Sequence, residues 1–439
     1  MSSGESGSTS SKGKSRVDVE IELSRPSEAL RLAEILNALG INGGEVAKDS
    51  ETYLVIPGNW GPRWLIPARS RASAFALSTW HPYTIPSRLK WLAIRMAART
   101  GALQLAGSVS SVAVSRAAVR QWFERCGIRS QAGDVAILVG NPSPDRKLAV
   151  FLLDDAHRIA AVLKVGLTVG GGISVLHEAE MLRKLEQYSW APELLTVHSE
   201  MGAASQKFVP GAMPERRFRS EFMDILCRLP RSGGSKSLAQ LADEIARRLD
   251  PFRVQLDRLA PDILGRSLDC LDLDISVPTM LVHGDFTPWN MRKNRKAGYV
   301  LVDWEWADFA GLPAYDLLHF QFNDDRLFGE KTGGYAAIRT KPICAEYFRR
   351  MDLNAELLPQ LAAAFLLDQL ESQCKQRGSQ YTTYTLRQLA SVADELGTTL
   401  RLGALGSKVS VIFWPPCFGV VQGSSSTRGG YVATEGLDG

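Results

Sequence analysis

The sequence predicts an α+β protein in which short strands precede a mainly helical region. Three apolar segments, 135–139, 148–153 and 159–165, follow one another with turn residues between them, which is typical of an antiparallel meander. From Arg216 onward, apolar residues recur at helical spacing instead. Strands and helices in separate blocks indicate the α+β class.

Length and composition predict two or three domains with a substantial core, since the chain has 439 residues and is 45% hydrophobic. The formal net charge of +4 and the pI near 8.7 fit anionic ligands such as nucleotides. No zinc-finger or RNA-binding signature occurs, so we expect no nucleic-acid partner.

The six cysteines are scattered without a C-x-x-C pair, which favours free thiols in a reducing compartment. The Ser/Gly-rich start lacks the apolar core of a secretory signal. The best membrane candidate, Val409–Val421, is too short for a bilayer and contains Pro415-Pro416. We therefore expect a cytoplasmic protein without a transmembrane segment.

The first part of the chain reads as a tail followed by a separate α/β region. Residues 1–16 are mostly Ser, Gly and Lys, a composition that predicts disorder. Residues 17–130 contain two predicted strands, Tyr53–Ile56 and Arg63–Ile66, around a Gly- and Pro-containing turn. No catalytic motif occurs there, so this region is predicted to be an accessory domain of unknown role.

A helix with an apolar face and basic residues is predicted around residues 88–99. Its apolar face consists of Leu89, Leu92, Ala93 and Met96. Its basic residues are Arg88, Lys90, Arg95 and Arg99. We interpret it as a helix that packs its apolar face on the core and solvates its basic face. The alternative is a helix that lies on an anionic membrane or a partner.

The helical half has its own pattern. Leu238, Leu241, Ile245 and Leu249 mark one helix face, and the preceding Arg231–Ser235 is predicted to be a loop. Two further amphipathic helices are marked by Leu358, Leu361 and Phe365 and by Leu386, Leu389 and Leu396. The Gly/Ser-rich segment 403–439 is predicted to be a flexible tail.

The stretch Leu281–Glu305 contains the candidate catalytic and metal-binding residues. Two short strand-like runs each end in an acidic site, the first in His283-Gly284-Asp285 followed by Asn290, the second in Asp303-Trp304-Glu305. Phosphoryl transfer needs a divalent metal and a carboxylate that deprotonates the acceptor hydroxyl. Magnesium prefers oxygen ligands, so Asn290 and Asp303 are predicted metal ligands and Asp285 the base.

These residues resemble a known family. The run from His283 to Asn290, followed by Asp303-Trp304-Glu305, is similar to the motifs of the aminoglycoside phosphotransferase and choline kinase-like family. The resemblance covers roughly Asp134 to Leu402. It implies a protein kinase-like fold of two lobes, a small antiparallel sheet lobe and a helical lobe. We assign residues 131–211 to the first lobe and 212–402 to the second, behind the accessory domain.

The resemblance also implies roles for residues of the first lobe. Lys164, at the end of the third strand, corresponds to the lysine that contacts the nucleotide phosphates, and Glu178 to the helix glutamate that holds it. Glu180 is the second choice for that partner. From the strand pattern alone, a lysine among apolar residues is also interpreted as an edge-strand charge that prevents aggregation.

Further contacts follow from the resemblance. Backbone groups from Lys207 to Val209 are expected to bind adenine, and backbone amides near Asn141–Ser143 to face phosphates. The run Gly170–Gly172 is interpreted as a flexible lead into a helix over Ser174–Leu185.

In the second lobe, His283 is expected to shape the catalytic loop rather than act as the base. Asp316 is expected to brace that loop, with a helix N-cap as its alternative role.

Together these features predict an ATP-dependent phosphotransferase that uses Mg²⁺. It would move the γ-phosphate to a hydroxyl of a sugar, amino alcohol or related metabolite. The alternative is a catalytically inactive, kinase-like nucleotide-binding scaffold that acts through the accessory domain. A protein kinase is disfavoured because no Ala-Pro-Glu motif follows Asp303. The accessory region puts an aminoglycoside substrate in doubt, because classical antibiotic-modifying members lack one.

Overall fold

The structure is a computed structural model with two compact units. Unit 1 comprises Met1–Glu186 and Pro192–Phe208, and unit 2 comprises Gln187–Ala191 and Val209–Gly439. The residues described are 34–36, 50–58, 61–69, 76–79, 82, 85–105, 109–127, 134–271, 274–294, 298–328, 334–375 and 379–405. The predicted tails therefore lie outside the described residues, apart from the end of one helix. Each unit is described by itself.

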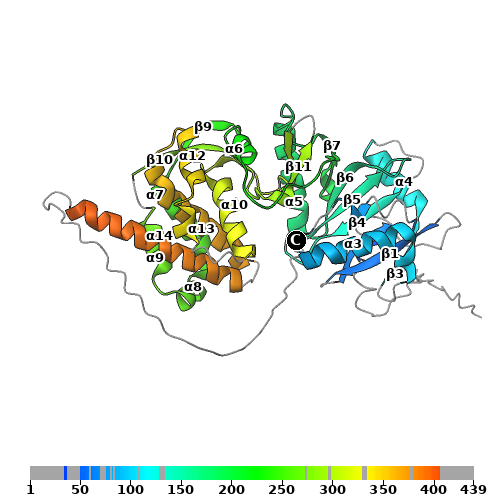
Figure 1. The fold of residues 1–439 in the computed structure, drawn as a ribbon, viewed down its shortest axis with the longest axis horizontal. Coiled ribbons are helices and arrows are strands. Elements are labelled where there is room, and N and C mark those ends of the chain that lie inside the picture. The colour runs from blue at the N-terminus through cyan, green and yellow to red at the C-terminus, as the bar shows by residue number, and fades with distance from the viewer. Residues whose placement is uncertain are drawn as a thin grey trace, which may run out of the picture. The chain divides into compact units, whose positions relative to one another are not determined.

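Unit 1 is built on one sheet of eight described strands, all paired antiparallel (Figure 1). Their order is β3-β1-β2-β4-β5-β6-β8-β7. The bounds are β1 Ser50–Gly58, β2 Gly61–Pro67, β3 Ser110–Ser115, β4 Val135–Val139, β5 Lys147–Leu153, β6 Ile159–Gly166, β7 Leu194–His198 and β8 Ala203–Lys207. The predicted meander is β4 to β6.

The predicted accessory region is continuous with this sheet. Strand β2 pairs with β4, with Trp64 opposite Leu138 and Leu65 opposite Ile137. The structure does not divide the chain between residues 130 and 131, where the sequence places a domain boundary. Strand β4 would be an apolar sheet edge without β2, and the pairing removes that edge.

Helices cover both faces of the sheet. On one face, Tyr53 and Val55 of β1 share a core with Trp122 and Phe123 of α4 (Arg116–Arg125). On the other face, the alternate residues Leu54 and Ile56 share a core with α3 (Ile85–Thr100). The two-residue alternation of strand side chains thus assigns one helix to each face.

The inward face of α3 differs from the predicted one. Trp91 and Ala98 are buried, whereas Leu89, Leu92 and Met96 are exposed. The indole N–H of Trp91 donates to the Leu77 carbonyl at 3.2 Å, and its ring centre lies 6.2 Å from that of Trp64. The prediction that the Leu89 face packs inward is wrong, because the large Trp91 side chain occupies the position over the sheet.

The glycine run is a packed helical turn rather than a flexible lead. Helix α5 spans Val169–Lys184 and therefore includes Gly170–Gly172. A Cβ on Gly171 would lie 2.1 Å from the Arg146 carbonyl oxygen, and one on Gly170 would lie 2.6 Å from the Pro144 carbonyl oxygen. The glycines allow close contact with the β4–β5 turn, which Gly140 precedes.

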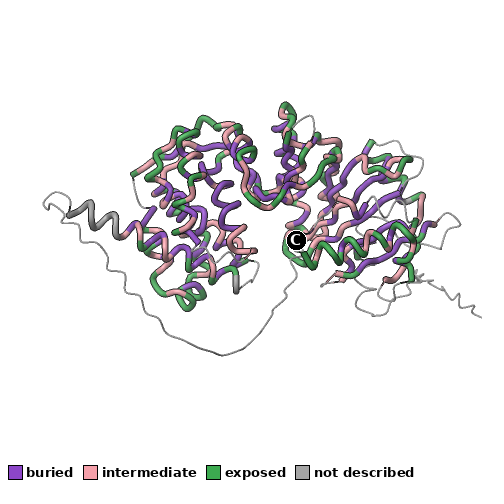
Figure 2. The backbone as a smooth tube through the Cα atoms, viewed as in Figure 1, coloured by how far each residue is buried: buried purple, intermediate pink, exposed green. Residues whose placement is uncertain are grey.

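Unit 2 is mainly helical (Figure 2). Its helices are α6 Ser220–Leu226, α7 Leu238–Leu249, α8 Arg253–Leu259, α9 Ile263–Asp269, α10 Tyr315–Phe328, α11 Tyr335–Ile338, α12 Pro342–Arg350, α13 Leu358–Lys375 and α14 Ser379–Leu405. The predicted face of α7 is confirmed, since all four of its apolar residues are buried.

Five short strands are described in unit 2 besides these helices. They are β9 Arg231–Ser237, β10 Ser276–Val282 and β13 Asp308–Gly311, in the order β13-β10-β9, and the hairpin of β11 Met291–Asn294 and β12 Gly298–Leu301. The predicted loop at Arg231–Ser235 is wrong, because this segment pairs with β10. No helix in the described part of the chain is long and apolar enough to cross a membrane.

Candidate active site

Unit 1 contains a buried ion pair between β6 and α5. The Lys164 ammonium lies 2.8 and 2.6 Å from the two carboxylate oxygens of Glu178. The two residues are only 9% and 2% exposed. Glu180, the second choice for this partner, instead bonds to Lys184 on the exposed side of α5 at 2.7 Å. The geometry therefore favours Glu178.

The packing of α5 places this pair. Val175 and Ala179 of α5 pack on Ala204 of β8, and Ala204 lies opposite Lys164 in the sheet. Glu178 then faces the same side of β6 as Lys164. A small hollow adjoins the pair, lined mostly by apolar side chains.

The β4–β5 turn, where phosphate contacts are predicted, is fixed by a residue from the first part of the chain. Arg63 of β2 donates to the Val139 carbonyl at 2.7 Å and to the Asn141 side-chain oxygen at 2.9 Å. The Arg146 N–H donates to the Ser143 carbonyl at 3.2 Å. The predicted accessory region thus supports this turn directly.

At the end of β8, part of the backbone that is predicted to bind adenine already forms hydrogen bonds within unit 1. The Lys207 N–H donates to the Glu193 carbonyl at 2.8 Å, and the Phe208 N–H donates to Ala160 at 3.1 Å. The Lys207 ammonium also bonds to the Glu193 carboxylate at 2.8 Å. The N–H groups of Lys207 and Phe208 are therefore already paired with backbone carbonyls.

In unit 2, the loop after β10 is held by the buried carboxylate of Asp316 on α10. Its oxygens accept from the His283 N–H at 2.7 Å and from the Gly284 N–H at 2.9 Å. Gly284 has φ of +81°, and a Cβ there would lie 2.1 Å from the Trp306 carbonyl oxygen. The middle residue of the motif must therefore be glycine.

His283 is fully buried and joins the two strand ends. Its Nδ1 accepts from the Asp285 N–H at 3.3 Å, so its Nε2 carries the proton and donates to the Val302 carbonyl at 3.0 Å. Its ring centre lies 4.5 Å from that of Trp304. With both nitrogens engaged by backbone, this side chain shapes the loop.

Asp285 is held by Asn290. The Asn290 amide nitrogen donates to the Asp285 carboxylate at 2.8 Å and to its carbonyl at 3.1 Å. The Asn290 carbonyl accepts from the Val302 N–H at 2.8 Å, across the start of the β11–β12 hairpin. Asp303, the next residue, has φ of +72°, which is rare for a residue with a side chain.

The structure adds His319, which the sequence reasoning did not select. Its Nε2 lies 3.7 Å from an Asp285 carboxylate oxygen. Burial lowers its pKa to about 3, so the imidazole is neutral. Burial also raises the pKa of Asp316 to about 7, although its two N–H donors oppose that shift. The signal for His319 is its spacing, one helical turn after Asp316.

A small pocket adjoins His319 within unit 2. It is lined by His319, Phe322, Asn323, Arg326, Phe365, Leu366, Gln369, Gln373, Tyr384 and Thr385. These residues come from α10, α13 and α14. Among the lining residues that the structure describes, amides and aromatic rings dominate, Arg326 carries a charge, and none is Asp or Glu.

The predicted metal ligands have suitable chemistry for magnesium. Since the Asn290 nitrogen bonds to Asp285, the other amide atom is an oxygen, the donor that Mg²⁺ prefers. Asp303 supplies a carboxylate. No group of three His, Cys, Asp or Glu residues within the described ranges could hold a metal. Two protein ligands suit an ion that completes its shell with phosphates and water.

Comparison with known proteins defines the class. Residues 148–353 match the phosphotransferase enzyme family. This match includes Lys164, Glu178 and the whole stretch from His283 to Asp316. It confirms the resemblance predicted from the sequence, and with it the predicted class of enzyme, a phosphotransferase. The match covers slightly less than half of the chain. A comparison with curated proteins finds no match.

Solved structures give weaker likenesses. They include aminoglycoside phosphotransferase APH(4)-Ia with ADP and hygromycin B (13% identity, 63% of this chain and 97% of that chain, TM-score 0.41). Aminoglycoside 2'-phosphotransferase-IIIa with GDP is 14% identical, covers 65% of this chain and 97% of its own, and has a TM-score of 0.42. Macrolide 2'-phosphotransferase type I is 15% identical, covers 62% of this chain and 97% of its own, and has a TM-score of 0.39.

Proposed function

We propose that this protein transfers the γ-phosphoryl group of a nucleoside triphosphate to a hydroxyl of a small molecule. The observation that carries the proposal is the loop from His283 to Asn290. Asp316 holds it by two backbone hydrogen bonds, and Asn290 fixes the Asp285 carboxylate. So many contacts around one partly exposed carboxylate support a role that depends on its position.

Asp285 is the proposed base. Its carboxylate accepts the proton of the acceptor hydroxyl while the hydroxyl oxygen bonds to the γ-phosphorus. The bond from that phosphorus to the β–γ bridging oxygen breaks, and the nucleoside diphosphate leaves. Asn290 orients the base through the 2.8 Å bond to one carboxylate oxygen. The neutral His319 beside the other oxygen adds no charge that would oppose proton transfer.

The remaining roles concern the nucleotide. Lys164, oriented by Glu178, binds the α- and β-phosphates, and Val209 contributes backbone to adenine. Asn290 and Asp303 hold magnesium, which supplies neutralisation of the phosphate charge when bound.

The pocket beside His319 favours an acceptor that is neutral or anionic. A polycation would need carboxylates around it, and none of the described lining residues is Asp or Glu. Gln369, Gln373 and Asn323 offer both donors and acceptors, as a compound with several hydroxyls requires. We therefore propose a sugar or related polyol as acceptor.

Magnesium-dependent release of ADP from ATP tests the reaction, with pooled hydroxyl acceptors. The expected result is release by the wild type and a fall of roughly 10²–10⁴-fold in turnover for Asp285→Asn, with nucleotide binding retained. Asp257→Asn, on exposed α8, is the matched control and should leave turnover unchanged. Unchanged turnover in Asp285→Asn contradicts the base assignment.

Two further arms separate the alternatives. Asp303→Ala should lose magnesium-dependent nucleotide binding, and retained affinity would mean that another group holds the metal. Pools of neutral polyols, sugar phosphates and aminoglycosides compare acceptor classes, and preference for the polycations would overturn the acceptor proposal. Nucleotide binding without release in any pool would favour the inactive scaffold.

A further inference from the structure

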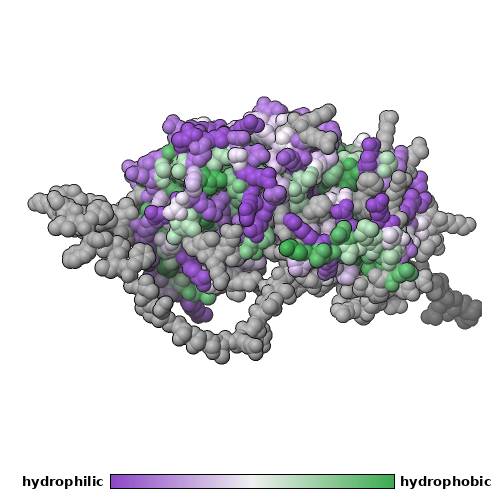
Figure 3. Space-filling view, viewed as in Figure 1, coloured by the Kyte–Doolittle hydropathy of each residue, from purple (hydrophilic) through white to green (hydrophobic). Residues whose placement is uncertain are grey.

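Helix α3 of unit 1 presents a stripe of apolar side chains to solvent. Ile85, Leu89, Leu92 and Met96 are 73%, 63%, 54% and 51% exposed. Their spacing of four, three and four residues places them on one line along a helix. Figure 2 shows α3 as largely exposed, and Figure 3 shows hydrophobic atoms along it. We call these four residues the α3 stripe.

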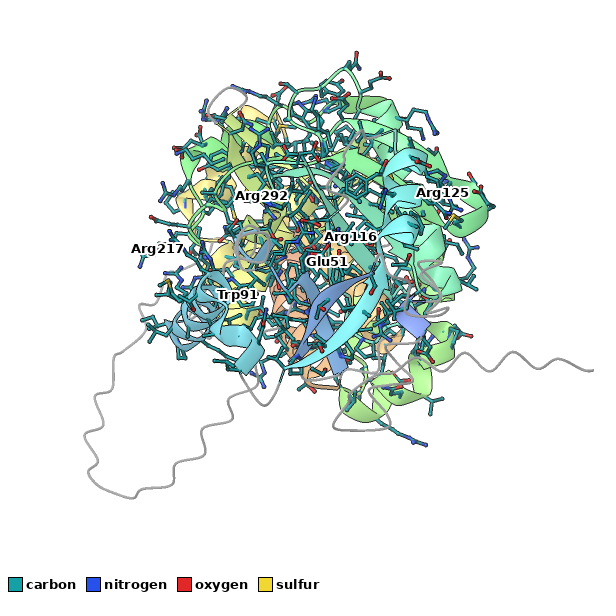
Figure 4. The ribbon with its side chains drawn as sticks, turned by 90° about the vertical axis from the view of Figure 1, so that its right-hand side faces the viewer. Glu51, Trp91, Arg116, Arg125, Arg217 and Arg292 are labelled. Atoms are coloured by element: carbon teal, nitrogen blue, oxygen red, sulfur yellow. The ribbon has the colours of Figure 1, made fainter. Side chains whose placement is uncertain are left out.

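The stripe cannot turn inward, because the opposite face of the same helix is anchored. Trp91 and Ala98 are buried against the sheet, with Ile94 partly buried beside them. Figure 4 shows Trp91 on α3 at the side of unit 1. Rotating the helix would remove the Trp91 ring from its contact with Trp64 and break its hydrogen bond to Leu77. Exposure of the stripe is therefore built into the packing.

Basic side chains border the stripe. At 100° per residue, Arg88, Arg95 and Arg99 fall along one flank of it, whereas Lys90 falls further round the helix, away from the stripe. Arg88, Lys90 and Arg99 are exposed and Arg95 is partly exposed. Residues 85–100 contain no Asp or Glu. An apolar line beside an unopposed row of cations is complementary to apolar chains beneath a negatively charged surface.

We propose that α3 docks unit 1 on the surface of an anionic phospholipid bilayer. The α3 stripe would enter the boundary between headgroups and acyl chains, and the arginines would contact lipid phosphates. A second copy of the chain is disfavoured as the occupant, because pairing two stripes brings two rows of cations together. Helix α3 lies outside the family match at residues 148–353, so this inference does not depend on the proposed reaction.

Vesicle co-sedimentation of the full chain tests the proposal. The probes are phosphatidylcholine vesicles and vesicles in which phosphatidylglycerol replaces part of the phosphatidylcholine. The expected result is binding to the second kind that is at least ~10-fold stronger than to the first and that weakens with added salt. Equal binding to both kinds, or to neither, would overturn it.

Two sets of variants separate the apolar and the charge contributions of α3 to vesicle binding. Leu89→Ser with Leu92→Ser removes the apolar component, and Arg88→Gln, Arg95→Gln and Arg99→Gln together remove the charge component. Each set should lower binding to the anionic vesicles roughly tenfold or more. Val254→Ser, which removes another exposed apolar side chain (68% exposed) in unit 2, should leave binding unchanged.

Controls keep the result specific. Because every altered residue of α3 is at least partly exposed, the thermal unfolding temperature should stay close to that of the wild type. ADP release in solution should also be unchanged. Wild-type binding by both α3 sets would show that another surface contacts the lipid. A dimer in solution that Leu89→Ser with Leu92→Ser dissociates would assign the stripe to a second copy instead.

Discussion

The two units hold their buried carboxylates in different ways. In unit 1, Glu178 pairs with the side chain of Lys164, and the partners come from a helix and a strand. In unit 2, Asp316 accepts from two consecutive backbone N–H groups, those of His283 and Gly284. The first arrangement depends on how α5 lies on the sheet. The second depends on the shape of one loop.

This difference predicts which changes in the sequence should disturb each of the two arrangements. The Lys164–Glu178 pair rests on an eight-stranded sheet whose first three strands precede residue 130. A change far away in the sequence, at β1 to β3, should therefore disturb it. The loop of unit 2 is fixed by Asp316, by Val302 and by its own glycine, so only local changes should disturb it.

Deletion of residues 1–130 is the strongest test and has the largest expected effect. It removes β1 to β3 and both helices on them, and it exposes Ala136 and Ile137, which are fully buried. The loss should exceed the stability of a typical domain, on the order of 10 kcal/mol. We expect an aggregating fragment that lacks nucleotide binding, measured by circular dichroism and nucleotide titration. A soluble fragment that binds nucleotide would show that residues 1–130 are a separate domain.

Glu178→Gln tests the ion pair itself. It leaves the Lys164 ammonium buried beside a neutral amide, which should lower the free energy of unfolding by about 4 kcal/mol. The KM for nucleotide should rise, since the lysine is no longer oriented. Glu180→Gln on the exposed side of the same helix is the matched control, with little change in either quantity. Equal effects of the two substitutions would remove the distinction between the two glutamates.

Asp316→Ala tests the arrangement in unit 2. The substitution leaves two buried N–H groups without their acceptor, at an expected cost of about 3 kcal/mol. Turnover should fall while the KM for nucleotide stays close to that of the wild type, because the loop carries Asp285 and the ion pair lies in unit 1. Steady-state kinetics at varied ATP separates the two quantities. A rise in nucleotide KM without loss of turnover would contradict this role.

The sequence predicted the strands and the motif because both are local. The meander is confirmed at β4 to β6. Its signals, the strand-like apolar runs and the turn residues between them, lie within a short stretch of sequence. The family is confirmed through motif residues that lie close together in the sequence. The resemblance to the family favours Glu178 over Glu180, and Glu178 is the glutamate that bonds to Lys164.

The remaining features depend on packing between distant segments. The sequence of residues 17–130 does not indicate that β2 pairs with β4, because both are ordinary apolar strands that could pair with other strands. On α3 two apolar faces compete, and the packing of Trp91 against Trp64 and its hydrogen bond to Leu77 select the inner one. The glycines of α5 are close-packed against a turn more than twenty residues earlier, which composition alone interprets as flexibility.

The smallest expected effect is a pH dependence that the two units share. In unit 1, burial and the neighbouring Asp134 raise the pKa of Glu51 to about 7, although Arg69 and Arg116 oppose the shift. Figure 4 shows Glu51 beside Arg116, whose side chain lies 3.6 Å from the carboxylate. His157 contacts Asp134 at 3.1 Å. In unit 2, burial raises the pKa of Asp316 to about 7 as well.

A raised carboxyl pKa means that the folded state favours the proton. The stability that these groups contribute is present below their ordinary pKa and is lost as the pH rises to about 7. Thermal unfolding temperature should therefore fall between about pH 4 and pH 7 and then level off. Glu51→Gln and Asp316→Asn should each flatten this slope by a few degrees, and the double variant by their sum, because the groups lie in different units. Equal slopes in all four proteins would mean that neither carboxyl binds its proton more tightly in the folded state.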